Sequence, residues 1–167
     1  MLRFLHFLRA SQPAARELCV VKEVVDLLQK YPQIKFERRG EDSVLVPPTN
    51  AEGFPVMIEQ IWEGHYAVSY GGWQKDFSSL EEAVACFVMG LSNHCRLKVE
   101  TKGKKPVRWT VEQLENADWK EISSRGGSWA PLSFKEPVTS YLRNDLLSDI
   151  RERAQEEVPV EPSRLAS

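Results

Sequence analysis

A run of cations with β-strand spacing occupies residues 96–108, and such a run could bind phosphate. On a hairpin it would form a basic ribbon that can lie along a nucleic-acid backbone and release its counterions. Lysines at a sheet edge also discourage edge-to-edge pairing, so a solvated edge is the competing interpretation. Strand parity places Arg96, Lys98, Glu100, Lys102 and Arg108 on the outward face. The aromatic side chain that base stacking needs is missing from this face, because Trp109 has the opposite parity. The cations are Arg96, Lys98, Lys102, Lys104, Lys105 and Arg108, opposed in this segment only by Glu100.

A second group that could bind a partner is aromatic. Tyr66 and Tyr70 share one strand parity with each other, Trp62 precedes them, and Trp73 follows two glycines. Large rings can anchor a protein partner, because they bury much area at low entropic cost. They can equally fill the layer between a sheet and a helix. We expect Trp73 to lie on an exposed loop, and we select Trp73 and Tyr70 as candidate binding residues.

The segment Ser-Ser-Arg-Gly-Gly-Ser-Trp at residues 123–129 could bind an anion. Its small residues can expose backbone N–H groups, and Arg125 could clamp the ligand. The strand-to-helix context of a phosphate-binding loop is missing, which favours an irregular connection. We add Arg125 and Trp129 to the candidate protein-binding set.

Cysteine and histidine offer little for catalysis. His94 and Cys95 are adjacent, and neighbouring residues of a strand point in opposite directions, so they do not form a nucleophile–base pair. The other cysteines, Cys19 and Cys86, lie on apolar helical faces, where a thiol behaves as a small hydrophobe. We therefore predict no catalytic residues, no metal site and no cofactor. An enzyme site assembled from Arg125, His94 and distant acids is retained as a third alternative.

Composition limits the class of protein. The chain has 167 residues, is 42% hydrophobic and 28% charged, and carries a formal net charge of −2. Its length suits one domain, and it contains no apolar run long enough to span a membrane. Three unpaired-looking cysteines suit a reducing compartment, so we expect a cytoplasmic protein. The basic, apolar start, residues 1–16, leaves organelle targeting as an alternative.

Hydrophobic periodicity assigns the elements that would position these residues. Apolar residues three and four apart predict a helix over residues 14–30, and a capping sequence at Ser79 predicts another over residues 80–89. Strict alternation predicts amphipathic hairpins over residues 56–70 and 97–111. Shorter strands are predicted over residues 34–38, 43–46, 119–122 and 138–142, and a loop over residues 123–133.

Strands joined by tight hairpins must be antiparallel. We therefore predict an α+β fold in two layers, a mostly antiparallel sheet built from hairpins with two helices packed on one face. Residues 13–145 would form the single domain. Residues 1–12 would be an N-terminal extension, and residues 146–167 a charged C-terminal helix or disordered tail.

These observations favour a small, soluble, non-enzymatic module that binds a protein. Nucleic-acid binding through residues 96–108 is the alternative. An edge strand of either hairpin could pair across a twofold axis, so a homodimer is also possible.

Overall fold

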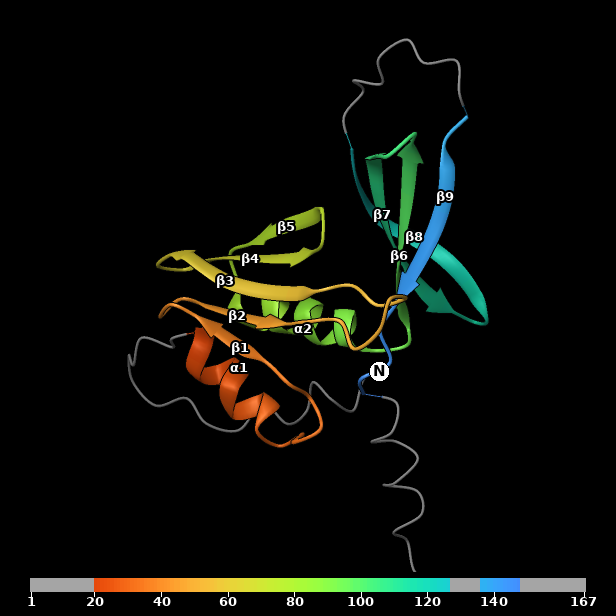
Figure 1. The fold of residues 1–167 in the computed structure, drawn as a ribbon. Helices are drawn as coiled ribbons and strands as arrows, with labels where there is room; N and C mark the ends of the chain where they lie inside the picture. The colour runs from red at the N-terminus through yellow and green to blue at the C-terminus, as the bar shows by residue number, and fades with distance from the viewer. Residues whose placement is uncertain (1–19, 127–135, 148–167) are drawn as a thin grey trace, which may run out of the picture.

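The computed structural model describes residues 20–126 and 136–147. In this part of the chain, two α-helices accompany nine strands in two antiparallel sheets, which confirms the α+β class (Figure 1). The helices are α1 (Val20–Leu28) and α2 (Leu80–Leu91). The five-stranded sheet follows chain order: β1 (Glu37–Arg39), β2 (Ser43–Val46), β3 (Val56–Trp62), β4 (His65–Tyr70) and β5 (Trp73–Phe77). The four-stranded sheet has the order β8 (Asp118–Gly126), β7 (Lys105–Glu115), β6 (Cys95–Lys102), β9 (Val138–Arg143).

Local sequence explains the turns and the second helix. Gly64 and Gly103 adopt positive φ of 73° and 63° at the β3–β4 and β6–β7 turns, where a side chain would strain the backbone. Ser79 caps α2, because its side chain accepts a hydrogen bond from the N–H of Glu82. Both predicted hairpins are confirmed, with Val56 opposite Tyr70 and Leu97 opposite Val111.

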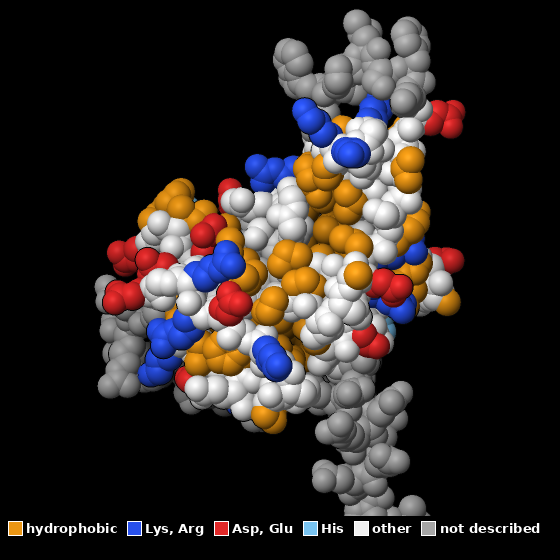
Figure 2. Space-filling view, in the orientation of Figure 1, with side chains coloured by type: hydrophobic (Ala, Val, Ile, Leu, Met, Phe, Trp, Pro, Cys, Tyr) orange, Lys and Arg blue, Asp and Glu red, His pale blue; other side chains and the backbone are white. Residues whose placement is uncertain are grey.

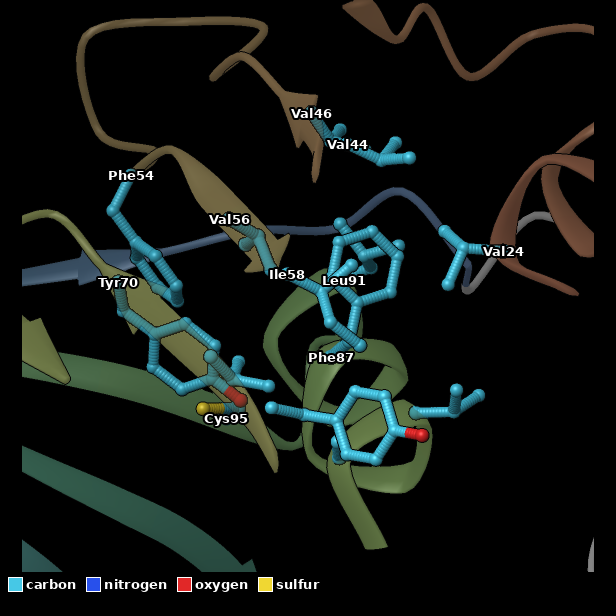
Figure 3. Close-up of a cluster of buried hydrophobic side chains, with 14 of the residues drawn as sticks. Val24, Val44, Val46, Phe54, Val56, Ile58, Tyr70, Phe87, Leu91 and Cys95 are labelled. Atoms are coloured by element: carbon cyan, nitrogen blue, oxygen red, sulfur yellow. The ribbon is translucent and has the colours of Figure 1, made fainter. Parts of the chain in front are cut away.

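The hydrophobic core lies between the helices and the five-stranded sheet and extends to Leu97 and Val111 of the four-stranded sheet (Figure 3). α1 contacts β2 and β3, and α2 contacts β3, β4 and β5. Val24 of α1 and Phe87 of α2 are buried in the same cluster as Val44, Ile58 and Tyr70 of the strands. Among the described residues, neither helix is both long and apolar enough to cross a membrane.

The prediction of one sheet is wrong, because the strands after α2 form a second sheet. β6 pairs with β7 and β9, and β4 is already flanked by β3 and β5. Periodicity missed β5, since its central residues Gln74, Lys75 and Asp76 are all polar. That strand fills the place beside β4 that a later strand would need to join the first sheet.

Some predicted boundaries also shift. The first strand is β1, later than the predicted residues 34–38, and Ile34 is buried outside it. β8 extends to Gly126, so the beginning of the predicted loop 123–133 is a strand. The predicted extension 1–12, Cys19 and all but the first two residues of the predicted tail 146–167 lie outside the described residues. Leu146 and Leu147 still pack against the core.

The two sheets meet through tight contacts. Trp109 of β7 lies against Gly72, where an added Cβ would come within 2.2 Å of the indole ring. Only glycine allows this approach. Trp73 of β5 donates a hydrogen bond from its indole nitrogen to Ser123 of β8, at 3.3 Å. The turn before β5 is therefore part of the contact between the sheets.

Candidate binding surface

The predicted aromatic site is part of the core. Trp73 is only 2% exposed and Tyr70 is fully buried, so the expectation of an exposed loop tryptophan is wrong. Their rings stack with centroids 4.8 Å apart, and the Tyr70 hydroxyl donates to the carbonyl of Cys86. β5 pairs with β4, which places Trp73 opposite Tyr70 on the core side. Neither side chain offers surface to a partner in this structure.

The other predicted binding residues do not join these two. Arg125 is exposed on β8, opposite Trp109 of β7. Trp129 lies outside the described residues. The set Trp73, Tyr70, Arg125 and Trp129 therefore does not form one surface in the part of the chain that the structure describes.

The groups considered for catalysis are inert or far apart. Burial raises the pKa of the Cys95 thiol to about 12, and burial also raises the pKa of Cys86. Both thiols stay protonated near neutral pH, where a nucleophile needs the thiolate. The carbonyl of His94 accepts a hydrogen bond from the N–H of Leu114 on β7, and Arg125 lies opposite Trp109 on the same strand. Leu114 and Trp109 are five residues apart, so His94 and Arg125 are separated by about 17 Å along the sheet. Within residues 20–126 and 136–147, no three His, Cys, Asp or Glu side chains gather as a metal would require.

The basic hairpin exposes a different surface. Its register places Arg96, Lys98, Glu100 and Arg108 on the side of the four-stranded sheet away from Leu97 and Val99, as the parity predicted. Acids neutralise two of the cations. Arg96 forms a salt bridge with Glu112 at 2.5 Å, and Lys98 forms one with Glu100 at 3.5 Å.

Two aromatic side chains lie on this same side, so the prediction that it lacks aromatics is wrong. Trp119 comes from β8 and Tyr141 from β9. The Arg96 guanidinium carbon lies 4.4 Å from the centre of the Trp119 ring and 4.3 Å from the centre of the Tyr141 ring. Rings at this distance attract a cation, and Glu112 holds the same guanidinium from β7. Four adjacent strands thus each contribute one member of a single cluster.

We call this side of the four-stranded sheet the outer face. Near its centre, the Arg96 guanidinium contacts the rings of Trp119 and Tyr141 and forms the ion pair with Glu112. Such a surface can bind a partner. The charged and aromatic side chains of the outer face include Arg96, Lys98, Glu100, Arg108, Glu112, Trp119, Glu121, Tyr141 and Arg143.

Sequence reasoning missed Trp119 and Tyr141 because their position depends on long-range pairing. β9 joins β6 with Tyr141 opposite Lys98, across more than 40 residues of chain. The sequence predicts a strand over residues 138–142, which contains Tyr141. It does not predict which strand this one pairs with.

No protein-family model, no curated protein and no solved structure matches this chain. The side chains of the outer face are therefore the basis for assigning a function.

Proposed function

We propose that this chain is a non-enzymatic protein-interaction module that recognises its partner with the outer face. The Arg96 cluster is the observation that carries the proposal. Tryptophan, tyrosine and arginine are the residues most enriched among interface side chains that dominate binding energy. Here Arg96 already contacts both rings and Glu112, so it would lose less conformational entropy on binding than an arginine without contacts.

Exposed apolar area on the outer face comes from Tyr141, which is 52% exposed beside Arg96. Val138 and Ile122 are also exposed on the edge strands of this sheet, but the register does not place either of them on the outer face. An exposed aromatic ring beside an arginine is typical of the side chains that dominate binding at protein interfaces.

The charge on the outer face also favours a protein. Four cations share it with three carboxylates, and Arg96 and Lys98 are each paired with one of those acids. Nucleic-acid affinity grows with the number of phosphates that free cations neutralise. A nearly balanced surface has a small phosphate-binding capacity and suits the mixed charges of a protein surface.

Truncating Tyr141 tests the proposal. We expect Tyr141→Ala to weaken partner binding by roughly tenfold or more, since a central interface aromatic typically contributes that much. Proteins captured from cells by the tagged wild-type chain would be identified and titrated against each variant. Circular dichroism would show that the variant remains folded.

The matched control is Trp62→Ala. Trp62 is similarly exposed, at 58%, but it belongs to β3 of the other sheet. It should leave partner binding unchanged. Equal affinity for wild type and Tyr141→Ala, or loss of binding only with Trp62→Ala, would contradict a role for the outer face.

Nucleic-acid binding is the second candidate, and one observation favours it. Lys102, Lys104 and Lys105 surround the β6–β7 turn, and no salt bridge among the described residues involves them. In Figure 2, lysine and arginine side chains gather at the upper end of the four-stranded sheet. The uncompensated charge thus lies at the turn rather than in the centre of the outer face.

Charge reversal at the turn tests this alternative. If the chain binds single-stranded RNA or DNA, replacing the three lysines with glutamate should abolish binding, and wild-type affinity should fall steeply with salt. Fluorescence anisotropy with labelled oligonucleotides at several salt concentrations measures both effects. Absent or salt-independent binding would exclude this alternative.

A further inference from the structure

We infer that β9 pairs with β9 of a second copy of this chain, joining two four-stranded sheets into one. This goes beyond the proposed function, because it concerns the edge of the sheet rather than its outer face. An isologous contact needs a surface that is complementary to itself. Five residues of β9, Val138 to Leu142, meet that requirement.

β9 is the unprotected edge of the described sheets. Proteins block edge pairing with charges, bulges or very short strands. β1 has three residues, all charged, and β5 has a lysine and an aspartate. β8 carries four charged residues and a register shift opposite Val111 and Glu112. β9 has no charged residue before Arg143 and no register shift against β6.

Hydrogen bonds show which β9 residues direct their backbone groups outward. The N–H of Arg143 donates to Glu52 at 2.7 Å, so it points away from β6. The Ser140 hydroxyl reaches the carbonyl of Val99, so that carbonyl points toward β9. Backbone groups alternate in direction along an antiparallel pair. Ser140 therefore bonds to β6, and Thr139 and Tyr141 present their N–H and C=O groups at the open edge.

Symmetry then selects one register. A twofold axis normal to the sheet leaves the outer faces of both copies on the same side of the joined sheet. Residues opposite each other must point to the same side, so an even-numbered residue can pair only with an even-numbered one and an odd-numbered residue only with an odd-numbered one. When the axis passes through Ser140, Thr139 of each copy lies opposite Tyr141 of the other. Each of these two pairs exchanges two backbone hydrogen bonds, which makes four in total. Centring the axis on Thr139 sets Tyr141 against Pro137, which has no N–H. Centring it on Tyr141 sets Thr139 against Arg143, whose N–H already bonds to Glu52.

The side chains suit the selected register. Val138, which is 70% exposed, would lie beside Leu142 of the copy, and Thr139 beside the Tyr141 ring. Ser140 would meet its own copy at the axis. No charged residue is opposed, so no like-charge repulsion enters the five-residue ribbon. So short a ribbon buries little area, which predicts a weak, concentration-dependent dimer.

Sedimentation velocity of the full chain over a range of concentrations tests the dimer. Thr139→Pro should weaken dimerisation by roughly tenfold or more, because it removes an N–H that each copy donates across the axis. The monomer should tolerate this proline, since the N–H of Thr139 points away from β6. Thr139→Ala keeps the N–H and should dimerise as wild type does. A wild-type chain that is monomeric at every concentration, or a Thr139→Pro variant that dimerises like Thr139→Ala, would overturn the inference.

Disulfide trapping tests the register, and it also decides the question if Thr139→Pro fails to fold. Ser140→Cys should form a cross-linked dimer under mild oxidation, whereas Val138→Cys should not. In the selected register the two copies of residue 138 are about 14 Å apart, and a disulfide needs Cα atoms within about 7 Å. The wild-type chain, oxidised in parallel, controls for its own cysteines. Cross-linking of Val138→Cys at the rate of Ser140→Cys would overturn the register.

A monomeric chain whose Tyr141→Ala variant still loses its partner would overturn the dimer and leave the proposed function intact.

Discussion

Trp73→Ala should lower the free energy of unfolding by about 3–5 kcal/mol, as expected when a buried tryptophan is truncated in a packed core. The side chain is almost fully buried, stacks on Tyr70 and donates to Ser123 across the contact between the two sheets. The substitution removes the stacking and the hydrogen bond and leaves a cavity. Urea unfolding followed by circular dichroism measures the effect.

Trp62→Ala is the control for this prediction as well. Its ring is mostly in solvent and contacts His65 at the neighbouring turn. We expect its free energy of unfolding to stay within about 1 kcal/mol of wild type, as for most exposed positions. Equal stability of the two variants would mean that Trp73 lies at the surface, which would contradict the structure.

Asn144→Ala should destabilise the fold by about 3 kcal/mol or more, because it leaves buried backbone groups without partners. Asn144 is 4% exposed and directly follows β9. Its amide donates to the carbonyls of Phe54 and Gly90, both at 2.9 Å, and its Oδ1 accepts from the N–H of Phe54 at 3.1 Å. One side chain therefore links the end of β9 to the segment before β3 and to α2.

Chemical unfolding of Asn144→Ala and of Asn50→Ala, compared with wild type, shows how much burial adds to the loss of stability. Asn50 also accepts a backbone hydrogen bond, from the N–H of Glu52, but it does so at the surface and between near neighbours. We expect Asn50→Ala to lose about 1 kcal/mol or less, because water can replace the lost bond. Similar losses for both variants would show that the buried bonds of Asn144 contribute no more than an exposed turn.

The features that the sequence predicted correctly are local. Alternation identified β3, β4, β6 and β7, and glycines marked their turns, because a hairpin brings neighbours in sequence together. The Ser79 cap was predicted for the same reason, since its hydrogen bond spans three residues. Strand parity also placed Arg96, Lys98 and Arg108 on one side of their sheet, because side chains alternate with a period of two.

The sequence alone thus determined the hairpins, the capped helix and which residues of a strand share a face. The tertiary structure decided what each face meets. β5 has a polar centre, so only its pairing with β4 revealed it as a strand and buried Trp73. The pairing of β6 with β9 brought Tyr141 beside Arg96 and made β9 an edge strand among the described residues. Contacts of this kind depend on how whole elements pack, because distant strands pair through the same backbone groups whatever their sequence.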